Sequence, residues 1–386
     1  MNLSKVRKLS ITAGVVILTL LLHLTIVAAA DFPRAIHLSW QNDPATTMTL
    51  MWRSAPGATG VVEYGKSPGE LTQTVESTTH SYRYARTEVY WHTAEITDLE
   101  PNTTYHYRIR TSEPWESEDY TFKTGIPQGE ESPFRFAVMT DSQGGYSNQA
   151  IAFEMVKAEN VDFILFLGDF TDTGNQQEWD VWFESGEGVL AEIPLLSVLG
   201  NHEGNQITYW DQFALPGLER WYSLVYGNTH LVFLNTNTQA EVERQRPVLL
   251  EVLENNESTW TIAMGHHPMY SSVTSKPEYQ FIIDAWLDVM EEYGVDLYFA
   301  GHNHCYERTW PIKDGSINED GIVHIVHGPV GNKYYSAESQ WWSKVIKADT
   351  SMYSIYEVEG QQIRATAKGL DGTIIDQFEI NKGGQN

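Results

Sequence analysis

The stretch Leu195-Leu-Ser-Val-Leu-Gly-Asn-His-Glu203 indicates how the second part of the chain folds. Its apolar run is short and continuous and ends at a glycine, which is typical of a strand buried on both faces. Asn201 and His202 follow this run, and amide and imidazole groups bind metal ions or, for imidazole, move protons. The stretch therefore predicts a buried strand of an α/β domain with reactive side chains at its carboxyl end.

The same arrangement recurs after four other apolar runs. The runs Phe136–Thr140, Phe163–Leu167, Thr261–Met264 and Leu297–Ala300 are followed by Asp141, Asp169, His266-His267 and His302-Asn303-His304. A glycine directly precedes the polar residues in every case except the first, and we expect it to let the chain turn sharply. Because the carboxyl ends of the strands line the ligand site of open α/β sheets, we expect these side chains to meet in one cleft.

Each of these clusters alone has an ordinary structural explanation. A Gly-Asp pair after a strand is usually a turn, and a lone histidine there is more often a hydrogen-bonded turn residue than a ligand. Five such clusters in one chain, each at the end of an expected strand, favour a common site instead.

The donor types in these clusters predict a metal centre. Carboxylate, amide carbonyl and imidazole groups suit Zn, Mn or Fe. Six candidate ligands are too many for one tetrahedral ion, and a carboxylate can bridge two ions about 3.5–4 Å apart that hold a hydroxide between them. The six candidates are Asp141, Asp169, Asn201, His266, His302 and His304. His202 is not needed as a ligand and is free for proton transfer.

Composition and charge narrow the function further. Apolar residues make up 41% of the chain and charged residues 20%, which fits a globular protein and excludes a disordered chain or a protein with many membrane spans. The net charge of −26 repels phosphate backbones, so we expect no nucleic-acid scaffold as a partner. Cys305 is the single cysteine, which excludes an intrachain disulfide and a cysteine-based zinc site.

Residues 1–30 have the order of residue types that is typical of a secretory signal. Lys5, Arg7 and Lys8 precede an apolar run over residues 11–27, and the small residues Ala28-Ala29-Ala30 follow it. We expect cleavage after Ala30, a secreted, periplasmic or cell-surface location, and no stable insertion in a membrane. The alternative is an uncleaved anchor, because the run is close to the lower length limit for spanning a bilayer.

The remainder of the chain divides into two predicted domains. Residues 31–127 contain short alternating strands separated by turn signals, which predicts an all-β sandwich with Tyr105 as a fibronectin-like tyrosine corner. A Gly/Pro-rich linker covers residues 125–133. Residues 133–386 predict an α/β domain with a large mixed sheet and helices over 148–160 and 279–293.

The five clusters and the domain order resemble the calcineurin-like metallophosphoesterases, and among them the purple acid phosphatases. The blocks that carry the resemblance are Asp141-Ser-Gln143, Gly168-Asp-Phe-Thr-Asp172, Gly200-Asn-His-Glu203, Ala263-Met-Gly-His266 and Gly301-His-Asn-His304. The family pairs a fibronectin III-like domain with an αββα-type catalytic domain, so the resemblance extends over nearly the whole chain after residue 30.

The resemblance implies a role for each residue of the site. Asp141 and His304 would hold the first ion, Asn201, His266 and His302 would hold the second, and Asp169 would bridge them. His202 would lie over the phosphoryl group, stabilise its charge and protonate the leaving group.

Three positions depart from the family pattern or leave a role open. Asp172 stands where the family has a metal-bound tyrosine, which puts a purple colour and a ferric first site in doubt. Gln143 stands where the wider superfamily often has histidine, and a weak ligand and a plain turn residue are both open interpretations. His267 is expected to support His266 rather than to bind metal, because its side chain should diverge.

The resulting hypothesis is an exported phosphatase with two divalent ions, Zn, Mn or Fe, which hydrolyses phosphate monoesters of small molecules. A phosphodiesterase or nucleotidase of the same fold is an alternative, since both reactions use the same metal core. A noncatalytic surface or adhesion protein is a further alternative, but it predicts broken ligands, and all six are intact.

Overall fold

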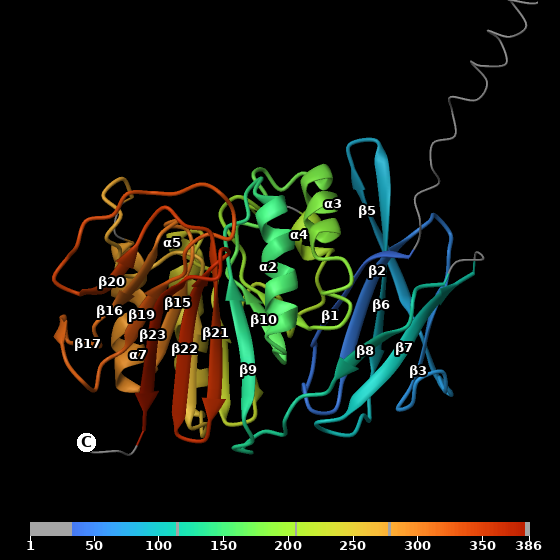
Figure 1. Ribbon diagram of the computed structural model, residues 1–386, viewed down its shortest axis with the longest axis horizontal. Helices are drawn as coiled ribbons and strands as arrows, with labels where there is room; N and C mark the ends of the chain where they lie inside the picture. Colours follow the sequence, from blue (N-terminus) through green and yellow to red (C-terminus); the bar gives the residue numbers. More distant parts are fainter. Residues whose placement is uncertain (1–32, 113–115, 205–206, 277–278, 383–386) are drawn as a thin grey trace, which may run out of the picture.

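The computed structural model describes residues 33–382 except 113–115, 205–206 and 277–278, and it contains two domains (Figure 1). The predicted signal segment, residues 1–30, lies outside the described residues. Among the residues described, no helix is both long and apolar enough to cross a membrane.

The N-terminal domain is the predicted β sandwich. Its two four-stranded antiparallel sheets have the orders β1-β2-β6-β5 and β4-β3-β7-β8. The strands are β1 (Arg34–Ser39), β2 (Met48–Ser54), β3 (Gly60–Gly65), β4 (Gln73–Glu76), β5 (Thr78–Tyr84), β6 (Thr87–Ile96), β7 (Thr104–Thr111) and β8 (Tyr120–Lys123). The Tyr105 hydroxyl accepts a hydrogen bond from the backbone N–H of Glu100 at 3.0 Å, as the predicted tyrosine corner requires.

The C-terminal domain contains two large sheets, which confirms the αββα architecture implied by the resemblance, whereas the apolar runs alone had predicted a single large sheet. The first sheet has the order β11-β10-β9-β21-β22-β23, and the second has the order β12-β13-β14-β15-β19-β16-β20. Both sheets mix parallel and antiparallel pairs. Apolar runs alone could not separate the two sheets, because strands buried on both faces look alike in sequence whichever sheet they join.

The strands of the first sheet are β9 (Phe134–Met139), β10 (Phe163–Phe166), β11 (Leu195–Ser197), β21 (Met352–Glu359), β22 (Gln362–Gly369) and β23 (Ile374–Asn381). Those of the second are β12 (Tyr222–Tyr226), β13 (Thr229–Phe233), β14 (Trp260–Met264), β15 (Leu297–Ala300), β16 (Tyr306–Thr309), β19 (Val323–Val326) and β20 (Ser343–Lys347). A short hairpin of β17 (Ile312–Lys313) and β18 (Ser316–Ile317) is separate from both.

The side chains of the second sheet show how the layers stack. Ile262 and Met264 of β14 join the core that contains the first sheet, whereas Ala263 joins a second core with the helical residues Trp286 and Met290. Successive side chains of a strand point to opposite faces, so one face of this sheet packs on the other sheet and one packs on helices. Because α2 contributes Phe153 to the first core, helices cover both outer faces and the domain is an αββα sandwich (Figure 1).

The helices are α2 (Tyr146–Ala158), α3 (Gln176–Ser185), α4 (Ile207–Trp210), α5 (Gln239–Glu254), α6 (Gln280–Ile282), η1 (Ile283–Leu287) and α7 (Asp288–Glu292). The two predicted helices are present, the first displaced by two residues and the second divided by the π-helical turn η1. The sequence analysis missed α3 and α5. Pro247 lies inside α5, and proline is a signal against a helix interior.

The two domains pack against each other through buried contacts. The backbone N–H of Leu38 donates to the carbonyl of Leu190 at 3.0 Å, and the Tyr107 hydroxyl donates to the carbonyl of Ala191 at 2.6 Å. Arg53 of the sandwich forms an ion pair with Asp180 of α3. The sandwich therefore supports the side of the first sheet that carries β11 and α3.

Candidate metal centre

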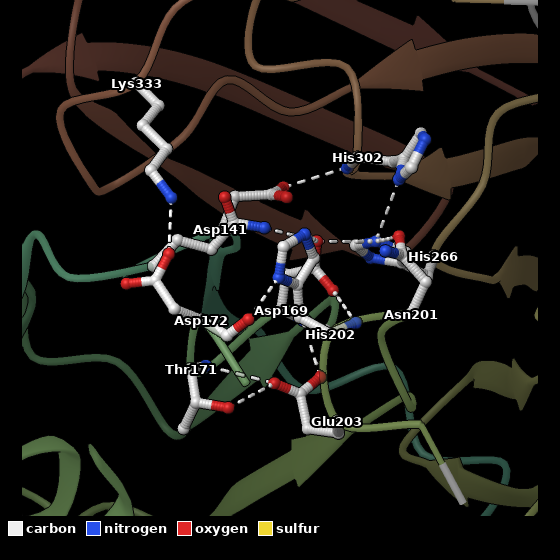
Figure 2. Close-up of polar contacts among 12 residues, drawn as sticks. Asp141, Asp169, Thr171, Asp172, Asn201, His202, Glu203, His266, His302 and Lys333 are labelled. Carbon is white, nitrogen blue, oxygen red and sulfur yellow. Dashed lines mark hydrogen bonds and ion pairs between the residues drawn. The ribbon is translucent and has the colours of Figure 1, made fainter. Parts of the chain in front are cut away.

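The predicted site residues lie together where the carboxyl ends of strands from both sheets meet (Figure 2). The loops after β9, β10 and β11 of the first sheet carry Asp141, Asp169, Asn201 and His202. The loops after β14 and β15 of the second sheet carry His266, His302 and His304. The prediction that the strand ends gather these residues in one place is confirmed, although two sheets rather than one do so.

Asp169 lies at the centre of the group. Its Oδ2 accepts a hydrogen bond from Gln143 Nε2 at 2.6 Å and lies 3.2 Å from His266 Nε2, while its Oδ1 accepts from the backbone N–H of His202 at 2.9 Å. Burial opposes ionisation of this carboxyl, but the facing His266 and His202 hold its pKa below the ordinary value. Asp169 is therefore a buried carboxylate shared by several loops.

His266 presents one nitrogen to the other candidate ligands. Its Nδ1 lies 2.7 Å from the carbonyl oxygen of Leu167, and because a carbonyl only accepts, Nδ1 carries a proton. Its Nε2 lies 3.1 Å from Asn201 Oδ1 and 3.2 Å from His302 Nδ1. Asp169 Oδ2 lies 3.2 Å from the same nitrogen, so His266 Nε2 has three ligand-type atoms as close neighbours.

The charge on His266 depends on whether a cation is present. Burial alone would lower the pKa of His266, but the carboxylate of Asp169 outweighs it and raises that pKa to about 9. The ring is then protonated at neutral pH and pairs with Asp169. A metal ligand must be unprotonated, so metal binding here releases a proton.

Asp141 and His304 form the other side of the group. His304 Nδ1 lies 2.9 Å from the carbonyl oxygen of Lys333, which leaves Nε2 to face Asp141 Oδ1 at 3.2 Å. Asp141 Oδ2 accepts from the Thr140 hydroxyl at 2.7 Å and from the backbone N–H of His302 at 2.9 Å. Asp141 Oδ1 is buried and has no hydrogen-bond partner among the described residues. A buried carboxylate oxygen that accepts no hydrogen bond is costly, and a cation bound between it and His304 Nε2 would satisfy it.

Two residues that the sequence analysis missed orient His302. The Tyr279 hydroxyl lies 2.6 Å from His302 Nε2, and Lys276 Nζ lies 3.4 Å from the same nitrogen. Burial and the charge of His266 lower the pKa of His302 well below its usual range, so the ring is neutral. Tyr279 lies 23 residues before His302, and no motif in the sequence connects the two.

His202 differs from the other histidines because its side chain is 35% exposed. Its Nδ1 lies 2.6 Å from the carbonyl oxygen of Asp172, and its Nε2 lies 3.9 Å from Asp169 Oδ2. Within the described part of the chain, two groups of side chains lie close enough together to hold a metal ion, Asp141-Asp169-His266 and His266-His267-His302, and neither His202 nor His304 belongs to them. The His202 ring therefore borders the site with one nitrogen accessible to a substrate.

Glu203, the last residue of the quoted stretch, supports the loop of Asp169 rather than facing the ligands. Its buried carboxyl accepts hydrogen bonds from the backbone N–H groups of Asp169 and Thr171, each at 3.0 Å, and from the Thr171 hydroxyl at 3.1 Å. Burial, followed by the charge of Asp169, raises the pKa of Glu203 to about 8. The glutamate thus fixes the backbone on which the central carboxylate sits.

The three residues whose roles were left open have defined surroundings. Gln143 is buried and donates to Asp169, so the interpretation as a surface turn residue was wrong. His267 Nδ1 lies 2.9 Å from the Thr236 hydroxyl, and a nitrogen of this ring lies within 4.8 Å of ligand nitrogens of His266 and His302. Asp172 forms an ion pair with Lys333.

The backbone at the site adopts conformations that L-residues rarely use. Asp141 and Asp169 have φ of 54°, and His302 and His304 have φ of 67° and 43°. Such left-handed residues cost on the order of 1–2 kcal/mol each and cluster at functional sites. Strain of this kind supports an arrangement selected for ligand placement rather than for stability.

The glycines that precede the site residues do not all serve the predicted purpose. Gly168 has a positive φ of 92°, as a sharp turn requires. Gly200 does not have a positive φ, so a sharp turn does not explain why this residue is glycine. A Cβ on Gly200 would lie 2.0 Å from the backbone nitrogen of Asp169. Gly200 is required because two ligand loops touch there, which no local sequence pattern reveals.

Comparison with known proteins shows which families the two domains resemble. The model of the purple acid phosphatase N-terminal domain matches residues 33–124, and that of the calcineurin-like phosphoesterases matches residues 134–306. Acid phosphatase type 7 of Mus musculus is 28% identical to the chain over 400 residues, covering 90% of each, and purple acid phosphatase 23 of Arabidopsis thaliana is 26% identical, covering 79% of this chain and 80% of that one. The solved structure of purple acid phosphatase PPD1 from yellow lupin has a TM-score of 0.82 at 19% identity, covering 91% of this chain and 74% of that one.

The chain contains a domain of the calcineurin-like metallophosphoesterase class over residues 134–306, in agreement with the αββα fold and the carboxylate and histidine site. Within this class it has the domain pair of the purple acid phosphatases. The protein is therefore a metal-dependent phosphoric ester hydrolase, and the interpretation as a noncatalytic surface protein was wrong.

Proposed function

We propose that the chain is an exported phosphatase that hydrolyses phosphate monoesters with two divalent metal ions. The observation that carries the proposal is the convergence of ligand-type side chains from five loops, all of them buried except the exposed Asn201. Asp169 Oδ2, His266 Nε2 and an oxygen of Asp141 lie within 4.8 Å of one another, and Asp141 Oδ1 has no hydrogen-bond partner among the described residues. Carboxylate, amide and imidazole donors of this kind suit Zn, Mn or Fe.

The distances support a division of the proposed ligands into two sets joined by one carboxylate. Asp141 and His304 would hold the first ion, since their facing atoms are 3.2 Å apart. Asn201, His266 and His302 would hold the second, around His266 Nε2. Asp169 would bridge the two positions, because it is the carboxylate next to both sets. When bound, the ions supply an activated hydroxide and neutralise the non-bridging phosphate oxygens.

The protein residues then orient the substrate and move a proton. His202 Nε2 borders the ligand group, and its Nδ1 proton is held by the Asp172 carbonyl oxygen at 2.6 Å. In its protonated form, Nε2 can donate to the oxygen of the departing alcohol, which is general acid catalysis. The buried carboxyl of Glu203 keeps the Asp169 loop fixed during this step.

The proposed monoester specificity and the proposed export of the protein are supported by separate observations. The relatives named above are acid phosphatases, and a phosphoenolpyruvate phosphatase of Allium cepa is 24% identical over 79% of this chain. Residues 1–30 have the composition of a secretory signal. A phosphodiesterase or nucleotidase would use the same metal ligands and would differ from a monoesterase in the substrate that it hydrolyses.

The test is phosphate release from purified protein reconstituted with Zn, Mn or Fe. We expect hydrolysis of p-nitrophenyl phosphate well above that of bis(p-nitrophenyl) phosphate, and loss of both activities with a chelator. A preference for the diester would overturn the monoester assignment. Mass spectrometry of the protein from culture medium or periplasm tests export, which requires a chain that begins after Ala30.

A further inference from the structure

An ion pair between Asp172 and Lys333 joins two loops at the edge of the candidate metal centre (Figure 2). Asp172 lies in the loop after β10, and Lys333 lies in the loop after β19. The Lys333 ammonium donates to Asp172 Oδ1. Residues 161 positions apart in the chain are held together by this contact.

Each member of the pair also orients one histidine of the site through its backbone. The carbonyl oxygen of Asp172 accepts from His202 Nδ1 at 2.6 Å, and the carbonyl oxygen of Lys333 accepts from His304 Nδ1 at 2.9 Å. A proton held on Nδ1 leaves Nε2 as the nitrogen that faces the site. The two side chains therefore connect the two carbonyl groups that set the orientation of His202 and His304.

The surroundings of Asp172 keep its carboxylate directed at Lys333. An ideal Cβ at Gly144 would lie 2.8 Å from Asp172 Oδ2, so this oxygen occupies space that the missing side chain of Gly144 leaves open. Gly144 has a φ of 72°, which a residue with a side chain would rarely adopt. Because Asp172 Oδ1 accepts from Lys333 and Oδ2 lies against Gly144, both oxygens of this carboxylate have contacts outside the group of predicted metal ligands.

We propose that Asp172 and Lys333 are positioning residues, whose ion pair fixes the orientation of the His202 and His304 rings. The part of the proposal that concerns catalysis rests on the proposed function. Exposed ion pairs contribute little to stability. Both side chains are partly exposed, at 35% for Asp172 and 47% for Lys333, so loss of the pair should change the rate far more than the melting temperature.

The experiment compares Asp172→Asn, Lys333→Met, the double variant and Lys333→Arg in the full chain. The control is Lys66→Met, which breaks an ion pair with Glu100 in the N-terminal domain and removes a lysine of equal exposure, 47%. Measured are kcat and KM for phenyl phosphate and p-nitrophenyl phosphate, metal ions per chain, and the melting temperature.

We expect each single variant to lose kcat on phenyl phosphate on the order of tenfold, because displacing a general acid loses part of its contribution. The loss should be smaller on p-nitrophenyl phosphate, whose leaving group needs little protonation, and KM and metal content should stay near those of the unmodified chain. The double variant should lose no more than either single variant, and Lys333→Arg should restore most of the rate. Additive losses, or an equal loss in Lys66→Met, would overturn the proposal.

A readout independent of turnover is the imidazole ¹⁵N spectrum of histidine-labelled, metal-free protein. We expect the His202 ring, assigned with the variant His202→Gln, to show a protonated Nδ1 in the unmodified chain and a mixture of tautomers in Asp172→Asn and Lys333→Met. If these shifts change while the unmodified chain releases no phosphate, the proposed function fails and the positioning role stands. If phosphate is released and the His202 shifts are the same in all variants, the positioning role is wrong.

Discussion

Replacing Asp169 by asparagine removes one negative charge from the carboxylate that faces both predicted metal positions. Asp169 Oδ2 lies 3.2 Å from His266 Nε2, so a cation among these ligands is a close neighbour of this carboxylate. Two unit charges about 4 Å apart attract by about 4 kcal/mol at an effective dielectric constant of about 20. Since about 1.4 kcal/mol is tenfold in affinity, we expect binding of at least one ion to weaken on the order of a thousandfold.

The substitution also disturbs the hydrogen bonds of the site. Gln143 Nε2 donates to Asp169 Oδ2 at 2.6 Å, and the backbone N–H of His202 donates to Oδ1 at 2.9 Å. An asparagine can accept from only one of these donors, so its amide nitrogen must face the other. We expect Asp169→Asn to retain at most one metal ion per chain and to lose nearly all phosphate release.

The assay is metal analysis after gel filtration, paired with phosphate release at saturating added metal. The control is Asp296→Asn, because Asp296 is also largely buried, at 14% exposure, but is paired with Lys382 and lies before β15, away from the strand ends that carry the site. Two ions per chain and an unchanged rate in Asp169→Asn would refute the bridging role.

Three further predictions address proton transfer, metal type and pH. His202→Ala should keep both metal ions and lose turnover on the order of 10²–10⁴, the range of a general acid, with a smaller loss for a nitrophenol leaving group; a loss of metal would make His202 a ligand instead. Purified protein should have no strong visible absorption band, because Asp172 stands in place of a metal-bound tyrosine and is engaged by Lys333, and a purple ferric preparation would contradict this. Burial lowers the pKa of His37 to about 4, so the neutral ring stabilises the fold above pH 6.5. This contribution, roughly 3 kcal/mol of the free energy of unfolding, is lost as the pH falls toward 4. In urea unfolding, the free energy of unfolding should decline less between pH 7 and 4.5 in His37→Gln than in the unmodified chain, and equal declines would contradict the assignment.

Local sequence patterns placed the candidate site residues near strand ends, but they did not show how the strands pair. Asp141, Asp169 and His266 each lie within three residues of the end of a buried strand, so the local pattern already placed them near strand ends. Local patterns do not say which strands pair, and thus one expected sheet became two. The site still formed as expected, because the carboxyl ends of both sheets meet at the same edge.

The residues that sequence analysis missed act through contacts between distant segments. Tyr279 reaches His302, and Lys333 reaches both Asp172 and His304, and none of these pairs has a spacing that a motif would record. For Gln143 the sequence left a weak ligand and a turn residue both open, because its burial depends on contacts between distant segments, such as its hydrogen bond to Asp169. Single-residue roles of this kind depend on tertiary packing.

The central claim is that two metal ions lie between the ends of the two sheets, and anomalous diffraction from crystals of the metal-loaded protein tests it most directly. We expect two peaks at the metal absorption edge, one against Asp141 and His304, the other against Asn201, His266 and His302, with Asp169 in contact with both. A single peak, or two peaks of which either lies away from these residues, would contradict it.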